Sequence, residues 1–203
     1  MINISVQNVT PLKREFFSRE TVIVAKELLG NYLVRKYANT FLIGKIIEVE
    51  AYLGIKDKAS HSYNLRKTNR TRIMYQKPGT LYVYLIYGMY HCLNVITEPE
   101  GIPCAVLIRK LYPIEGIPIM KQNRNVTLRK NFKNLMDGPG KLCMAMDITK
   151  EKFNGIDSCV KKSDLFFSIG AQIKKNHILT GRRIGIDYAE EDKDKMLRFW
   201  IEV

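Results

Sequence analysis

The sequence predicts a single domain that mixes helices with strands, and three observations support this class. The chain has 203 residues, of which 46% are hydrophobic and 26% charged, as is usual for one globular domain. Residues 45–53 alternate between apolar and polar side chains, and residues 81–97 contain two further strands around a tight turn. Helical patterns lie outside these strands, and no repeat, low-complexity segment or linker divides residues 1–203.

The predicted strand 41–53 carries the first candidates for chemistry. One face of its second half is apolar, with Ile47, Val49, Ala51 and Leu53. The opposite face holds Glu48, Glu50 and Tyr52, because side chains at i and i+2 share a face of a strand. A loop containing His61 follows. Two interpretations stay open: an exposed or salt-bridged strand face, or the floor of a site that uses carboxylates.

The chain is strongly basic. It has 33 Lys and Arg against 20 Asp and Glu, a net charge of +13. A protein this basic most often has a polyanionic partner, with nucleic acid first and an acidic membrane surface second. No run of about 18 apolar residues could span a membrane, and the first residues lack the pattern of a secretory signal.

The cysteines predict a reduced, cytoplasmic protein. They form no CxxC pair and neighbouring runs are apolar, so we expect reduced, mostly buried thiols at Cys92, Cys104, Cys143 and Cys159. Their spacing and the presence of only three histidines argue against a zinc, iron–sulfur or histidine-rich metal centre.

The remaining elements follow from periodicity and turn residues. We expect helices at 18–30, with Ser18 as its cap, at 115–122, and in the run after 137–141. We expect strands at 32–36, 41–53, 82–86, 90–96, 105–109, 165–170, 183–188 and 197–201. Residues 54–77 form a long basic loop, and loops of this length often carry function. Residues 190–194 form an acidic surface loop that should face away from a polyanion.

The turn between the two tyrosine-rich strands predicts a second functional feature. Tyr87-Gly88-Met89 joins the strands, and Gly88 is free to adopt a positive φ. Sheet packing explains Tyr82 and Tyr90. Large apolar side chains at the tip of a hairpin on a basic protein are open to two interpretations, packing or a wedge that enters a nucleic-acid stack.

Two further basic segments lie in the second half of the chain. Lysines and arginines between 121 and 133 indicate either a solvated surface or one that follows phosphates; they are Lys121, Arg124, Arg129, Lys130 and Lys133. The stretch 137–141 is not a P-loop, because Leu135 and Leu142 stand where that motif needs glycine and a hydroxyl residue. Its helix start could still offer backbone N–H groups to one phosphate.

Six blocks of sequence, taken in order, resemble the alkyladenine (3-methyladenine, or methylpurine) DNA glycosylase family. They are EVEAYLG at 48–54, ASHS at 59–62, KPGTLYVYLIYGMYHCLNV at 77–95, VLIRKLYPIEG at 106–116, DGPGKLC at 137–143 and RIGI at 183–186. A tyrosine hairpin alone is weak evidence, whereas six blocks in order are highly specific. The resemblance implies an α+β domain around a curved antiparallel sheet with a protruding β-hairpin. It also implies an enzyme that flips damaged purines out of duplex DNA and hydrolyses their N-glycosidic bond.

Matched position by position, the resemblance implies roles for the pocket. Glu50 corresponds to the carboxylate that activates water, and Arg109 to the arginine near that water and the DNA backbone. The backbone carbonyl of Ile184 is a further water contact. Tyr52, His61 and Tyr84 line the base pocket and sandwich the ring, and Asn94 excludes guanine.

The resemblance also implies how DNA is held. Tyr87 fills the gap left in the base stack, with Met89 beside it, and Arg70 and Lys141 contact the DNA. The implied partner is double-stranded DNA containing damaged purines, bound by a monomer without a metal or other cofactor. A bacterial protein of this kind would be cytoplasmic and associated with the nucleoid.

Two departures and one alternative remain. The loop 64–67 differs from the commoner glycine-containing family sequence, and the loop 190–194 is variable, so the preferred lesions stay open. A nucleic-acid-binding module without chemistry is the alternative function, although it has no need of a carboxylate facing an anionic backbone. A membrane-surface protein is disfavoured because no basic amphipathic helix is present.

Overall fold

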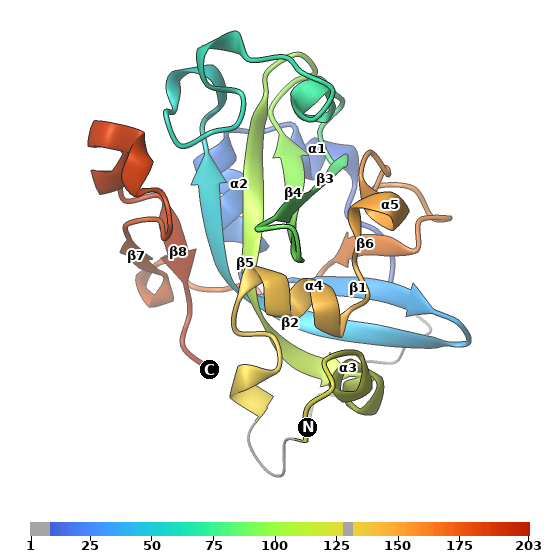
Figure 1. Cartoon of the computed structure of the whole chain (residues 1–203). Helices are drawn as coiled ribbons and strands as arrows, with labels where there is room; N and C mark the ends of the chain where they lie inside the picture. Colours follow the sequence, from blue (N-terminus) through green and yellow to red (C-terminus); the bar gives the residue numbers. More distant parts are fainter. Residues whose placement is uncertain (1–8, 128–131) are drawn as a thin grey trace.

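The structure is a computed structural model that describes residues 9–127 and 132–203. These residues form a mixed α+β fold around a curved antiparallel sheet, which confirms the predicted fold class (Figure 1). Its strands are β1 (Tyr32–Tyr37), β2 (Thr40–Tyr52), β3 (Leu81–Ile86), β4 (Tyr90–Thr97), β5 (Cys104–Glu115), β6 (Leu165–Ser168), β7 (Leu179–Gly181) and β8 (Arg198–Trp200). Its α-helices are α1 (Arg14–Phe17), α2 (Thr21–Leu28), α3 (Ile117–Asn123), α4 (Pro139–Ala145) and α5 (Lys150–Phe153).

Strand β2 is the centre of the sheet. One edge of β2 pairs with β5, and the sheet continues through β4 to β3. The other edge pairs with β1 along its first half and with β8 at residues 48–50, so one long strand joins two parts of the sheet. Val49 and Ala51 are fully buried in the core, as the alternation predicts, and Ile47 packs against them.

Strand β5 is much longer than predicted, and a β-bulge at Arg109 interrupts its pairing with β2. Glu48 pairs with Lys110 and Val49 pairs with Ile108, so Arg109 is left over in the register. A β-bulge bends a strand and redirects a side chain, and bulges are frequent beside active sites. The prediction that the strand ends at Arg109 was therefore wrong: the chain continues to Glu115 with its register shifted.

Helices cover both faces of the sheet. Helix α2 packs on β2 and β5, and α4 packs on β4 and β5; Figure 1 shows α2 behind these strands and α4 in front of them. Helix α3 begins two residues later than predicted, and Pro118 lies in its first turn, where proline is tolerated. Helix α4 begins at Pro139, directly after Gly138.

The first helix and one late strand differ from the prediction. Residues 18–30 do not form one helix capped by Ser18, which instead follows α1. Helix α2 starts at Thr21, whose backbone N–H and hydroxyl both donate to the carboxylate of Glu98, at 3.2 and 2.7 Å. Residues 183–188 are not a strand, since the backbone N–H of Ile184 bonds a side chain, Glu50, at 2.8 Å. Strand β7 was not predicted.

The hairpin formed by β3 and β4 confirms the predicted turn. Tyr87 and Gly88 both have positive φ, at 54° and 71°, and the N–H of Met89 donates to the carbonyl of Ile86 at 3.2 Å. Two positive φ angles in sequence are typical of the type I′ turn, whose twist matches that of antiparallel strands. Tyr87 and Met89 are 81% and 65% exposed, so the turn presents two large side chains to solvent.

The state of the cysteines and the lengths of the helices are two further features of the fold. All four cysteines are free, and Cys92, Cys104 and Cys143 are buried, as predicted. In the described parts of the chain, no helix is long and apolar enough to cross a membrane.

Candidate active site

The candidate active site is a cavity of about 950 Å³ between the sheet, the loop 54–77, helix α4 and the segment around Ile184. Volumes of this size are typical of small-molecule sites. Glu48, Glu50 and Met89 are not part of its lining. The candidate residues that do line it are Tyr52, His61, Arg70, Tyr84, Tyr87, Asn94, Arg109, Lys141 and Ile184. Segments far apart in the sequence thus meet at one concave surface.

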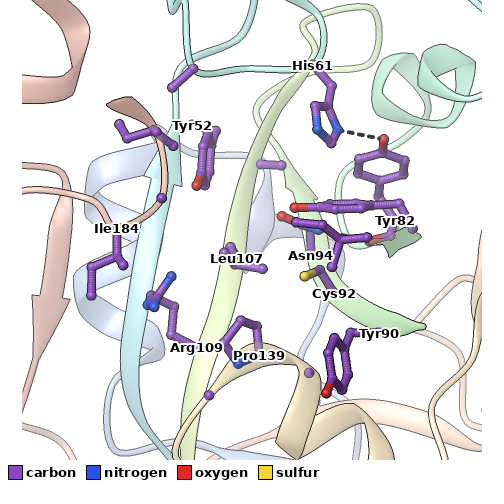
Figure 2. Close-up of a pocket in the computed structure, with 18 of the residues that line it drawn as sticks. Tyr52, His61, Tyr82, Tyr90, Cys92, Asn94, Leu107, Arg109, Pro139 and Ile184 are labelled. Carbon is purple, nitrogen blue, oxygen red and sulfur yellow. Dashed lines mark hydrogen bonds between the residues drawn. The ribbon is translucent and has the colours of Figure 1, made fainter. Parts of the chain in front are cut away.

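Aromatic side chains form two opposite walls of the cavity. Figure 2 shows Tyr52, at the end of β2, facing His61 and Tyr82 across the cavity. The rings of His61 and Tyr84 meet edge to face, with centroids 4.6 Å apart, and Tyr82 lies 5.4 Å from Tyr84. Aromatic side chains on two sides of a cavity suit a flat aromatic ligand.

His61 is fixed in a neutral state. Its Nδ1 lies 2.9 Å from the hydroxyl of Tyr82 (Figure 2). Burial, together with the nearby Arg70 and Arg66, lowers the pKa of His61 to about 4. The imidazole is therefore uncharged near neutral pH and adds no positive charge to the cavity.

Glu50 lies immediately behind the cavity wall. The residue is fully buried, and three lining residues hold its carboxylate. Oε2 accepts from the hydroxyl of Tyr52 at 2.9 Å, and Oε1 accepts from the backbone N–H of Ile184 at 2.8 Å and faces NH1 of Arg109 at 3.2 Å. Burial raises the pKa of Glu50 above its ordinary value, although Arg109, the Ile184 N–H and Tyr52 all favour the anion.

Glu48 has a different environment, although it lies on the same strand. It too is buried, but its carboxylate contacts three cations: Arg109 at 3.2 Å, Lys110 at 2.8 Å and Arg198 at 3.2 Å. Burial alone would raise the pKa of Glu48, yet these cations outweigh it and hold the pKa below its ordinary value. Neighbouring carboxylates whose pKa values are pushed apart are typical of sites that divide chemical roles between them.

The salt-bridged interpretation of this strand face holds for Glu48, whereas a site that uses carboxylates remains a prediction for Glu50. Glu48 is salt-bridged, while Glu50 borders the cavity. Ile184 approaches Glu50 through its backbone N–H, whereas the family resemblance implies a role for its carbonyl.

Asn94 lies on β4 inside the cavity and is 4% exposed. Its Nδ2 donates to the backbone carbonyl of Tyr82 at 3.1 Å, which fixes the orientation of the amide. Figure 2 places Asn94 at the back of the cavity near Cys92. A buried amide at this point satisfies a backbone group and also faces any ligand in the cavity.

The basic candidate residues lie at the margin of the cavity. The guanidinium of Arg70 lies 5.0 Å from the centroid of the Tyr84 ring. Nζ of Lys141 pairs with Asp137 at 2.7 Å, so this lysine is held at the start of α4. Of the basic run 121–133, Arg129 and Lys130 lie outside the described residues, whereas Arg124 also lines the cavity.

Several residues that line the cavity were not predicted as site residues, among them Tyr90, Gly140 and Cys92. Tyr90 is 40% exposed and lines the cavity, so its assignment to sheet packing was wrong, whereas Tyr82 is buried in the sheet and also faces the cavity. Gly140 allows α4 to approach Tyr90, because a Cβ there would lie 3.1 Å from that ring. Cys92 also lines the cavity. Its place two residues before Asn94 on one strand is the signal that could have revealed it.

The sequence was compared with models of protein families and with known proteins. A family model described as methylpurine-DNA glycosylase matches residues 15–203, so the chain has the sequence of a DNA glycosylase. A protein of Clostridium novyi named "Putative 3-methyladenine DNA glycosylase" is 51% identical over 196 residues, which cover 94% of each chain. A protein of the same name from Clostridium perfringens is 48% identical over 200 residues, covering 94% of this chain and 95% of its own. The chain belongs to the methylpurine-DNA glycosylase family.

Proposed function

We propose that this protein is a DNA glycosylase that removes alkylated or deaminated purines from duplex DNA and leaves an abasic site. Glu50 is the base that activates water, and the damaged purine occupies the cavity between Tyr52 and the His61–Tyr84 wall. The observation that carries the proposal is the buried carboxylate held by three residues that line an aromatic cavity. Family membership and the net charge of +13 support DNA as the substrate.

The carboxylate retains capacity for a water molecule. An ionised carboxylate accepts about four hydrogen bonds. Tyr52, the Ile184 N–H and Arg109 account for three neighbours of Glu50, so a water on the cavity side can take a further position. Arg109 favours the ionised form that accepts a proton.

The proposed reaction depends on the positive charge that develops on the sugar as the glycosidic bond breaks. The bond between C1′ and the purine nitrogen breaks with its electron pair on the purine, and positive charge develops on the sugar. The carboxylate of Glu50 stabilises that charge and takes a proton from the water, whose oxygen bonds to C1′. A purine alkylated on a ring nitrogen already carries positive charge, so it departs as a neutral base.

The exposed turn supplies the second part of the proposal. Tyr87, 81% exposed at the tip of the β3–β4 hairpin, enters the base stack at the position that the flipped nucleotide vacates, with Met89 beside it. Arg70 and Lys141, at the margin of the cavity, contact the DNA backbone. We also propose that the protein acts as a monomer in the cytoplasm, a location that its free cysteines favour.

The alternative function is a nucleic-acid-binding module without chemistry. Such a module would bind through phosphates, and a fully buried carboxylate beside the cavity would only cost it desolvation. The glycosylase proposal explains why Glu50 is retained there.

Substitution of Glu50 tests the proposed function. Wild-type protein, Glu50→Gln and Glu151→Gln are incubated with duplexes that carry 3-methyladenine, 7-methylguanine, hypoxanthine or ethenoadenine, and abasic sites are revealed by alkaline strand scission. Glu50→Gln should lose about 10²–10⁴-fold in single-turnover rate and retain lesion binding. Glu151, which is exposed on α5, is the matched control and should have no effect. Lack of excision by the wild type would favour the binding module.

A trapping experiment tests the expected product. Among the described residues, Lys141 is the one lysine in the cavity lining, and its Nζ is paired with Asp137, so we expect no amine to attack C1′. Borohydride should therefore trap no covalent enzyme–DNA adduct. A trapped adduct would contradict a mechanism in which water is the nucleophile.

A further inference from the structure

Arg109 is shared between two buried carboxylates on one strand. Its Nε donates to Oε1 of Glu48 at 3.2 Å, and its NH1 lies 3.2 Å from Oε1 of Glu50. The side chains of Glu48 and Glu50 are 3% and 0% exposed, and that of Arg109 is 12% exposed where it lines the cavity (Figure 2). Arg109, which lines the cavity, thus joins the Glu50 carboxylate to that of Glu48, which Lys110 and Arg198 also contact.

The bulge in β5 makes this arrangement possible. Successive side chains of a regular strand point to opposite faces of a sheet. Arg109 and Lys110 are successive, yet both bond Glu48, because Arg109 is the extra residue of the bulge. A guanidinium can bind one carboxylate through two parallel N–H groups. Here the Nε–H of Arg109 donates to Glu48, so it is not available for a bidentate interaction with Glu50.

We propose that Glu48 is a positioning residue for the reaction: it holds Arg109 by Nε and so keeps the guanidinium from closing on the Glu50 carboxylate. This inference rests on the proposed function of Glu50. Without Glu48, Arg109 moves onto Glu50, occupies the position that a water needs, and makes the carboxylate a weaker base.

The charged and titratable groups around the two carboxylates predict the direction of the pH effect. Glu48 faces Arg109, Lys110 and Arg198. The groups that act on Glu50 or respond to it are Tyr52, Cys92, Arg109, Arg183 and Tyr188. Glu48→Gln removes a negative charge near Glu50 and releases Arg109 toward it. Both changes favour ionised Glu50, so the acid limb of the excision profile should move to lower pH.

The test compares Glu48→Gln with the wild type in single-turnover excision on a lesion duplex. The maximal rate should fall on the order of 10–100-fold, as is usual when a catalytic group is misplaced. Affinity for the lesion duplex should be unchanged, and the acid limb should move to lower pH. A merely structural role would lower the fraction of active protein without moving that limb. A wild-type rate and pH profile in Glu48→Gln would overturn the inference.

Two further variants separate positioning from charge balance. Glu48→Gln with Lys110→Gln has the same local formal charge as the wild type, so it removes the excess positive charge that Glu48→Gln alone leaves beside Arg109 and Arg198. It should remain as slow as Glu48→Gln, and recovery of the wild-type rate would overturn the inference. In an Arg109→Gln background, Glu48→Gln should cause no additional loss, because Glu48 acts through Arg109. Additive losses would also overturn it.

The outcomes remain distinct from those of the proposed function. If the wild type excises no lesion, the proposed function fails. If the wild type excises lesions and Glu50→Gln does not, but Glu48→Gln equals the wild type, only the positioning role fails.

Discussion

Arg183→Met is expected to destabilise the protein far more than Arg14→Met, although the two arginines form ion pairs of equal length. NH1 of Arg183 lies 2.5 Å from Asp57, and NH2 of Arg14 lies 2.5 Å from Asp157. The side chains of the first pair are both 0% exposed, whereas those of the second are 32% and 35% exposed. The pairs therefore differ in burial, and Arg183 also binds the second oxygen of Asp57 through NH2 at 2.8 Å.

The expected magnitudes follow from that burial. Removal of Arg183 leaves the carboxylate of Asp57 without its cation in a site that water does not reach, and this typically costs about 3–5 kcal/mol. Asp57 also accepts from the backbone N–H groups of Leu53 and Ala59, so it anchors both ends of the segment that leads to His61. Removal of Arg14 leaves Asp157 open to water and should cost at most about 1 kcal/mol.

Urea-induced unfolding followed by circular dichroism measures the difference. With an m-value of about 2–3 kcal/mol/M, Arg183→Met should lower the unfolding midpoint by roughly 1–2.5 M urea. Arg14→Met should lower it by less than about 0.5 M at the same m-value. Equal losses in the two variants would refute the argument that burial decides the contribution of these pairs.

Three other outcomes are expected. Tyr87→Ser should weaken binding to a lesion duplex but spare undamaged DNA and protein stability, because the side chain is 81% exposed in the free protein; equal losses on both duplexes would make Tyr87 a phosphate-binding or packing residue. Asn94→Ser should allow excision of guanine from G·T duplexes while hypoxanthine excision from I·T duplexes persists, since only a group set against the 2-amino position separates these bases; an unchanged ratio would leave Asn94 a structural amide. The pKa of His61 is lowered to about 4 from 6.5 in the folded protein, so the unfolded chain takes up a proton first as pH falls. The stability that neutral His61 contributes should be present above pH 6.5 and lost toward pH 4, and His61→Gln should flatten this part of the curve of unfolding free energy against pH; parallel curves would contradict the role of burial.

Local signals were sufficient for several elements of the fold. The alternation of 41–53 predicted β2, and a glycine between large side chains predicted the β3–β4 turn, because both depend on side-chain period and backbone sterics within a few residues. The family resemblance also brought together residues that line the cavity, including Tyr52, His61 and Asn94. Their catalytic and binding roles remain predictions.

Other features depend on contacts between distant parts of the chain. The first residue of α2, Thr21, is held by a hydrogen bond to Glu98, which lies 77 residues away in the sequence. The bulge at Arg109 depends on how β5 pairs with β2. Helix and strand propensities depend on neighbouring residues only, so they could not predict either contact. The same reason explains why the predicted helix start at Ser18 and the predicted strand end at Arg109 were wrong.

The sequence by itself determined that two glutamates and a tyrosine share one strand face, but only the tertiary structure distinguished the two acids. Glu48 meets cations from β5 and β8, with Arg109 61 residues away and Arg198 150 residues away. Glu50 meets Tyr52 from its own strand and the backbone of Ile184, 134 residues away. Because burial and opposite charges act through space, identical side chains two positions apart acquire opposite pKa shifts and different surroundings.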